Sequence, residues 1–126
     1  MLINFSNHPC IKWSAGQINA AIDAFGSIVD YIFPAVDPEL SSEEVLELAE
    51  RCAADIASLA PDAVLCQGEF SLAFEVAVLL LKMGIRVVCA CSKRDSNEEL
   101  GEDGETKKTI RFKFAGFRDY LLPASI

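Results

Sequence analysis

The sequence predicts an α/β fold in three layers, with a mostly parallel sheet of about five strands between helices. Short apolar segments alternate along the 126 residues with longer segments of helical periodicity. Most of the short segments are apolar throughout, which is typical of parallel strands buried on both faces. The last segment, 106–117, alternates apolar and polar side chains, so we expect a strand with one exposed face.

Two capping patterns locate the first two helices. Ser14 and Gln17 precede one helical stripe, and Ser41 and Glu44 precede a second. A third helix, 71–83, ends before Gly84. The expected elements are strand 2–6, helix 15–25, strand 27–33, helix 42–59, strand 63–67, helix 71–83, strand 86–92 and strand 106–117. We expect residues 1–126 to form one domain.

The order of these elements restricts the topology of the sheet. Strands that alternate with helices form parallel sheets with right-handed crossovers. We expect a flavodoxin-like, and therefore Rossmann-like, strand order of 2-1-3-4, with the last strand antiparallel at the edge.

Charge is unevenly distributed along this acidic chain. The formal net charge is −8, yet segment 95–105 alone holds six acidic residues and no basic one. We predict that this segment is an acidic loop. Seven of the eleven Lys and Arg residues lie between residues 93 and 118, at 93, 94, 107, 108, 111, 113 and 118. A locally basic surface could therefore bind a small anion, whereas duplex DNA is not an expected partner.

Cysteine usage and hydropathy indicate a cytoplasmic protein. The five Cys residues include no CxxC pair, which favours buried thiols in a reducing compartment. No apolar run reaches the about 18 residues that cross a bilayer, and the N-terminus does not resemble a signal peptide. With one His in the chain, we expect neither a metal site nor a cofactor.

Polar residues follow three of the expected strands at one edge of the sheet. Ligands of open α/β sheets bind beyond the carboxyl ends of the strands, where the strand order reverses. The candidate ligand-binding residues are Ser6, Asn7, Gln67, Gly68, Glu69, Phe70, Ser71, Ser92 and Lys107, and the candidate catalytic residues are His8, Lys93 and Arg94. Histidine exchanges a proton near neutral pH, and Lys and Arg stabilise phosphate charge.

Several of these residues also have purely structural interpretations. Gly68 could serve only the turn, Ser71 could cap the following helix, and Phe70 could cover the core. Glu69 would interact favourably with the helix dipole, but it would also repel an anion. We therefore expect Glu69 to contact a ribose or a base rather than phosphate.

Five blocks, "INFSNHP", "VDP", "VLCQGEF", "ACSKR" and "FKFAGFRDY", are spread over nearly the whole chain. They resemble small CRISPR-associated Rossmann-like proteins related to CARF sensors and ring nucleases. The resemblance implies an antiviral protein that forms a homodimer and binds a cyclic oligoadenylate across two carboxyl-end rims. It also implies metal-independent cleavage of the ring, in which a ribose 2′-OH attacks the adjacent phosphate.

Two other functions remain open from the sequence. The chain could be a non-catalytic binding or interaction module, because helix 71–83 is apolar on several sides. A second copy covering that helix would give a homodimer. Alternatively, the chain could process a nucleotide or nucleoside with Glu69 as nucleophile or base.

Overall fold

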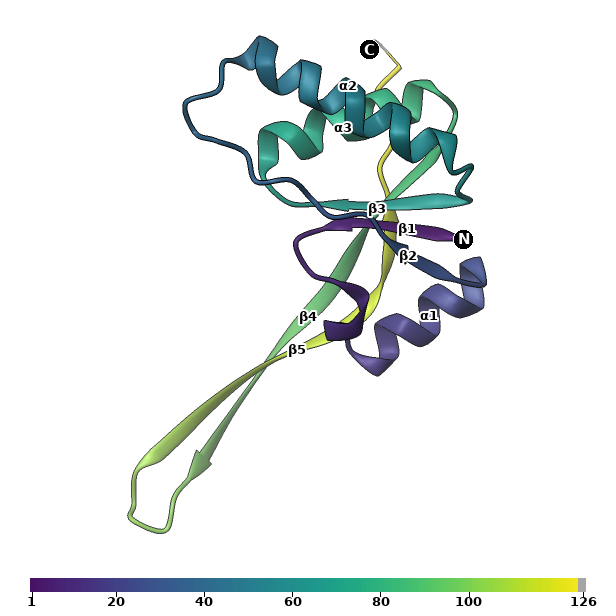
Figure 1. Ribbon diagram of the computed structural model, residues 1–126. Helices are drawn as coiled ribbons and strands as arrows, with labels where there is room; N and C mark the ends of the chain where they lie inside the picture. The colour runs from purple at the N-terminus through teal and green to yellow at the C-terminus, as the bar shows by residue number, and fades with distance from the viewer. Residues whose placement is uncertain (125–126) are drawn as a thin grey trace.

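The computed structural model describes residues 1–124, which form five strands, three α-helices and one 3-10 helix (Figure 1). The elements in chain order are β1 (Leu2–Ser6), η1 (Cys10–Lys12), α1 (Ala15–Phe25), β2 (Ile28–Asp30), α2 (Ser42–Ser58), β3 (Ala63–Gln67), α3 (Phe70–Lys82), β4 (Arg86–Leu100) and β5 (Thr106–Asp119). Both capping predictions are confirmed. Ser14 accepts a hydrogen bond from the Gln17 amide, and Ser41 and Glu44 form a reciprocal capping box.

The strands form one open mixed sheet in the order β2-β1-β3-β4-β5, as the sequence predicts. The first four strands are parallel, and β5 is antiparallel to β4 at the edge. Helices α2 and α3 cover one face of the sheet, and α1 covers the other (Figure 1). Alternate residues of β1 serve the two faces: Phe5 packs with the α2–α3 core, whereas Leu2 packs with α1.

The second strand is shorter than predicted. The prediction placed a strand at 27–33, but β2 ends at Asp30. The last bond towards β1 comes from the Tyr31 amide, which donates to the Asn4 carbonyl. Phe33 then turns inward, where its ring packs 4.6 Å from that of Phe5. Tyr31 and Phe33 therefore contact the core from a loop, whereas Ile32 between them is exposed.

β4 and β5 continue beyond the sheet as a projecting two-stranded ribbon, which we call the arm (residues 92–114) (Figure 1). β3 pairs with β4 only as far as Val88, whereas β4 pairs with β5 as far as Leu100. The arm begins at a β-bulge, where β5 has one extra residue, Ala115, opposite the step from Cys91 to Ser92.

The predicted acidic loop at 95–105 is wrong, because the segment is strand as far as Leu100. Only 101–105 form the turn, in which the Gly101 amide donates to the Glu105 carbonyl (2.7 Å). Acidic residues of β4 lie opposite basic residues of β5, in the pairs Asp95–Arg111, Glu98–Lys108 and Glu99–Lys107. These cross-strand pairs favour a ribbon in a segment with little apolar content.

One buried thiol gives the fold a pH dependence. Burial raises the pKa of Cys66 from 9.0 to about 12. Between pH 9 and pH 12 the thiol ionises in the unfolded chain but not in the folded one. The free energy of unfolding therefore falls as the pH rises through this range. We expect wild type to lose about 1 kcal/mol more than Cys66→Ala between pH 8 and pH 10. Urea denaturation under reducing conditions measures this difference, and equal losses in the two proteins would contradict it.

No helix among residues 1–124 has both the length and the apolar character needed to cross a bilayer.

Candidate functional site

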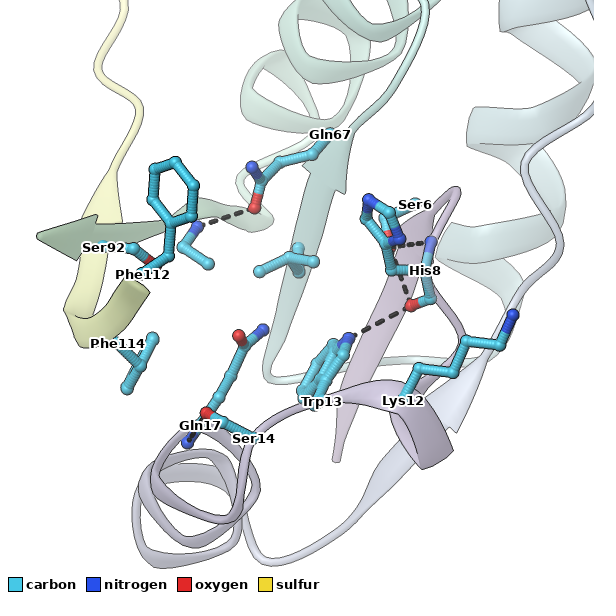
Figure 2. A pocket seen from close by; sticks show the side chains of 12 residues that line it. Ser6, His8, Lys12, Trp13, Ser14, Gln17, Gln67, Ser92, Phe112 and Phe114 are labelled. Carbon is cyan, nitrogen blue, oxygen red and sulfur yellow. Dashed lines mark hydrogen bonds between the residues drawn. The ribbon is translucent and has the colours of Figure 1, made fainter. Parts of the chain in front are cut away.

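A cavity of about 300 Å³ opens at the carboxyl ends of β1 and β3 and beside the middle of β4, on the side of the sheet that carries α1 (Figure 2). Its walls come from strands, from the start of α1 and from the arm. The lining residues are Ser6, His8, Lys12, Trp13, Ser14, Gln17, Leu65, Gln67, Ala90, Ser92, Phe112 and Phe114. The cavity is at the lower end of the sizes typical of ligand sites.

The cavity lies where the strand order reverses. β1 and β3 are neighbours, but α1 follows β1 on one face of the sheet and α3 follows β3 on the other. This divergence leaves an opening beyond the strand ends, which is where open α/β sheets bind ligands. The site therefore lies at the edge that the sequence indicated, with Ser6, His8, Gln67 and Ser92 brought together there.

A buried asparagine holds the loop that carries His8. Asn4, 1% exposed, donates from Nδ2 to the His8 carbonyl and to Asp30 Oδ1, both at 2.8 Å. Its Oδ1 accepts from the Ser6 hydroxyl at 2.7 Å. The His8 carbonyl also accepts from Trp13 Nε1 at 3.0 Å (Figure 2). These bonds fix the positions of Ser6, His8 and Trp13 along one wall of the cavity.

Gln67 presents an oriented amide on the opposite side. Its Oε1 accepts from the Ala90 backbone amide at 2.8 Å (Figure 2). Nε2 is hydrogen-bonded to no residue among 1–124, so its two N–H donors are available to a ligand.

Eight of the twelve residues that line the cavity were not predicted from the sequence. Lys12 ends η1, Trp13 and Ser14 connect it to α1, and Gln17 lies in the first turn of α1. The capping pattern of Ser14 located the helix, but it gave no sign that its first turn faces the strand ends. Phe112 and Phe114 come from β5 and line the side opposite His8 (Figure 2). Their alternation predicted a strand but not its cavity-facing side.

The cavity is free of acidic residues in a strongly acidic chain. The net charge of the protein is −8, yet no Asp or Glu is among the lining residues. Lys12 contributes a positive charge, and the His8 ring can donate a hydrogen bond. The wall is therefore compatible with an anionic ligand.

Glu69 is the N-cap of α3 and does not line the cavity. Its carboxylate accepts from the Ser71 and Leu72 amides at 3.1 and 2.9 Å, and also from the Ser71 hydroxyl. These hydrogen bonds, that of Leu72 foremost, hold the pKa of Glu69 below its ordinary value. The helix accordingly begins at Phe70, so the suggestion that Ser71 is the cap is wrong. The predicted repulsion of an anion by Glu69 therefore does not apply to this cavity.

Gly68 and Phe70 do not line this cavity and make contacts elsewhere. The Gly68 Cα lies so close to Phe33 that an added Cβ would be 2.5 Å from its ring. Phe70 is 91% exposed, so the interpretation that it covers the core is wrong. It lies with Phe74 in an apolar groove of about 270 Å³ between α3 and the chain segment 120–123. The homodimer through helix 71–83 stays a prediction.

The remaining candidates lie outside the cavity. Asn7 lines a separate cavity of about 510 Å³ beside β2. Arg94 lies directly opposite Phe112 on the arm, one register position from Lys93. Lys107 pairs with Glu99 towards the end of the arm. Of the predicted cations, only Arg94 shares a register position with a residue that lines the cavity.

Metal ligands do not gather in the part of the chain that the structure describes. Within residues 1–124, no group of three or more His, Cys, Asp or Glu side chains is placed to hold an ion. Cys10 is the thiol nearest to His8 in sequence, and its Sγ lies 3.6 Å from Asp30 Oδ2. Burial, followed by the Asp30 carboxylate, raises the pKa of Cys10, which favours the unreactive thiol.

Comparison with protein families adds one finding. The model of the uncharacterized protein MJ1673 family matches residues 1–118. The chain belongs to this family. The match includes every strand and helix of the fold except the last residue of β5, and it includes all residues that line the cavity. No curated protein and no solved structure matches the chain. Membership of the MJ1673 family therefore establishes a relationship but no activity.

Proposed function

We propose that the cavity binds an adenine nucleotide, and that its full ligand is a cyclic oligoadenylate. The observation that carries this proposal is an acid-free, aromatic-walled cavity at the strand-order reversal of an acidic chain. The strand order and the position of the cavity also support a Rossmann-like classification of the domain.

Each wall of the cavity can serve one part of a nucleotide. Trp13, Phe112 and Phe114 offer ring faces on which a base can stack. The amides of Gln67 and Gln17 can donate to and accept from the edge of a base. Lys12 can pair with phosphate. At about 300 Å³, the cavity accommodates one nucleotide unit, so the rest of a ring would extend past Phe112 towards Arg94.

His8 is the residue best suited to metal-independent ring cleavage. In this step the imidazole accepts the proton of a ribose 2′-OH, and the 2′ oxygen attacks the adjacent phosphorus. The bond from phosphorus to the 5′ oxygen breaks, and the leaving oxygen takes up a proton from water, while the imidazolium returns its proton to solvent. The products are a 2′,3′-cyclic phosphate and a 5′-OH. Arg94 would stabilise the charge that develops on phosphate.

The binding proposal has a direct optical test. Trp13 lines the cavity and is the single tryptophan of the chain, so its fluorescence should change when a ligand enters. We expect saturable changes with cyclic tri-, tetra- or hexa-adenylate and a weaker response to AMP. Lys12→Ala should weaken binding about tenfold, as expected for the loss of one charge-assisted hydrogen bond. Lys82→Ala, at the exposed end of α3, should leave binding unchanged.

The outcomes separate binding from catalysis. No fluorescence change and no calorimetric binding with any of these compounds would contradict the proposal. If binding occurs, His8→Ala should preserve it and abolish the linear products seen by chromatography, with and without EDTA. Equal cleavage by His8→Ala would exclude His8 as the base.

The Glu69-dependent enzyme that the sequence left open gains no support, because this carboxylate caps α3. The interaction module is favoured by one observation: the large exposed hydrophobic side chains outside the cavity. These include Phe70 and Phe74 on α3, and Leu100 and Ile110 on the arm.

A further inference from the structure

We propose that Cys89 and Cys91 of β4 bind one soft monovalent cation, such as copper(I), between their two sulfur atoms. The pair lies on the side of the sheet that carries α2 and α3, whereas the cavity lies on the side that carries α1. The proposal is therefore independent of whether the cavity binds a nucleotide.

The two cysteines share one face of β4. Side chains alternate along a strand, and Val87 packs in the α2–α3 core whereas Val88 packs in the α1 core. Cys89 and Cys91 therefore project on the same side as Val87. Both are free thiols and partly exposed, so an ion can reach them from solvent. Gly116 lies directly opposite Cys91 on β5 and has no side chain to cover that thiol.

The spacing of the pair suits a bridging ion better than a disulfide. Two residues along a strand span about 6.6 Å, and strand side chains stand roughly perpendicular to the sheet, so the two Cβ atoms are separated by a similar distance. A disulfide requires Cβ atoms about 3.5–4.5 Å apart. A metal–thiolate bond is about 2.3 Å long, so a linear sulfur–metal–sulfur unit places the sulfurs about 4.6 Å apart. The sulfurs reach this separation by leaning towards each other while the backbone stays extended.

The surroundings of Cys89 show that the second thiol is close to it. Burial, followed by the charge and hydrogen bond of the neighbouring Cys91 thiol, raises the pKa of Cys89. The Tyr120 hydroxyl and the positive charge of Arg118 lower this pKa in turn. A thiol, a hydroxyl and a guanidinium group therefore surround the Cys89 sulfur.

Basic side chains beside the pair can balance the charge of the complex. Two thiols that bind Cu⁺ release two protons, and the resulting bis-thiolate complex carries a charge of −1. Arg118 lies directly opposite Cys89 in the strand register. Lys93 follows Cys91 on the same face, and Lys113 lies directly opposite Lys93. The two lysines repel each other across the strands, so a negative charge beside them is favourable.

The number and the kind of ligands favour a soft, two-coordinate ion. Thiolates are soft ligands that select ions such as copper(I) over hard cations. Within residues 1–124, no group of three or more His, Cys, Asp or Glu side chains is placed to hold an ion, whereas structural zinc sites use four ligands. Cys66 of β3 is 1% exposed, and its Sγ donates to the Ala73 carbonyl at 3.4 Å. Cys89 and Cys91 are therefore the two ligands.

Anaerobic titration of the reduced protein with Cu⁺, in competition with the chelator bicinchoninate, tests the proposal. We expect wild type to hold one Cu⁺ per chain. Loss of an outer partner of a metal ligand already costs about 10–100-fold in affinity, so Cys89→Ser and Cys91→Ser should each weaken binding by about 100-fold or more. Cys10→Ser is the matched control and should bind as wild type does, because Cys10 is also partly exposed but lies beside Asp30. Circular dichroism confirms that each variant is folded.

Two results of the titration would overturn the proposal. One is a wild type that yields its Cu⁺ at the same chelator concentration as the Cys89→Ser/Cys91→Ser double variant. The other is a Cys10→Ser protein that loses Cu⁺ as readily as Cys91→Ser.

X-ray absorption at the copper edge tests the ligands in wild type and decides the matter if a serine variant fails to fold. Two sulfur neighbours are expected, and nitrogen or oxygen neighbours would contradict the assignment. An excess of Zn²⁺ of about 100-fold should leave the copper in place, because Zn²⁺ prefers four ligands. Displacement of the copper by Zn²⁺ would rule out a two-coordinate soft site.

Discussion

Replacement of Asn4 by aspartate should destabilise the protein by about 3–5 kcal/mol at pH 7. The new carboxylate would be 1% exposed and would face Asp30, whose Oδ1 is 2.8 Å from the present amide nitrogen. The amide donor that satisfies both the His8 carbonyl and Asp30 would be lost, and two like charges would take its place. The loop that carries Ser6 and His8 would then be displaced.

Urea denaturation at pH 7 and pH 5 measures this effect. Burial and the neighbouring Asp30 raise the pKa of the introduced carboxyl group in the folded state. Its proton is therefore retained at lower pH, and the deficit relative to wild type should be smaller at pH 5 than at pH 7. Asn7→Asp is the matched control, because Asn7 is exposed and makes none of these bonds. Equal effects at the two positions would show that the Asn4 network contributes nothing.

Replacement of Gly68 by alanine should destabilise the protein by about 1–3 kcal/mol, because it overpacks the core. The added Cβ would lie 2.5–2.8 Å from three atoms of the Phe33 ring. That ring cannot move freely, since it is buried and packs against Phe5. We also expect reduced ligand affinity, because Gln67 immediately precedes this glycine.

Gly16→Ala is the control for this substitution. A Cβ at Gly16 meets only the Ser14 hydroxyl, at 4.0 Å, so stability should be unchanged or up to about 1 kcal/mol higher. Thermal unfolding of both variants measures the contrast. A Gly68→Ala protein as stable as wild type would show that Phe33 can shift without cost.

The strand order and the location of the site could be predicted because they follow from the order of strands and helices along the chain. The apolar segments at 2–6 and 63–67 are short and continuous, and each is followed by a helix, which determines a parallel sheet and the edge at which ligands bind. Ser6 and Gln67 end strands and His8 follows one, so their convergence needed only the topology, whereas Ser92 lies within β4, which continues past the predicted end of that strand.

The missed features depend on contacts between distant segments. The outer half of β4 has little apolar content, and its strand conformation is supported by residues such as Lys107 and Lys108 opposite Glu99 and Glu98. Glu69 is the N-cap of α3 because this helix begins at Phe70, one residue before the predicted start at Ser71. Trp13 is held at the cavity by the hydrogen bond that its Nε1 donates to the His8 carbonyl, and no local sequence pattern indicates this contact.

The bulge at Ala115 determines the chemistry of the entire arm. Side chains alternate along a strand, so one additional residue reverses the face of everything beyond it. Phe114 and Phe117 are three positions apart, yet their rings lie 5.1 Å from each other on the same side. Without Ala115, the lysines and arginine at 113, 111 and 107 would point towards the cavity side, and the phenylalanines would point away. The presence of one extra residue in β5, rather than the identity of any side chain, thus decides which face of the arm is aromatic and which is charged.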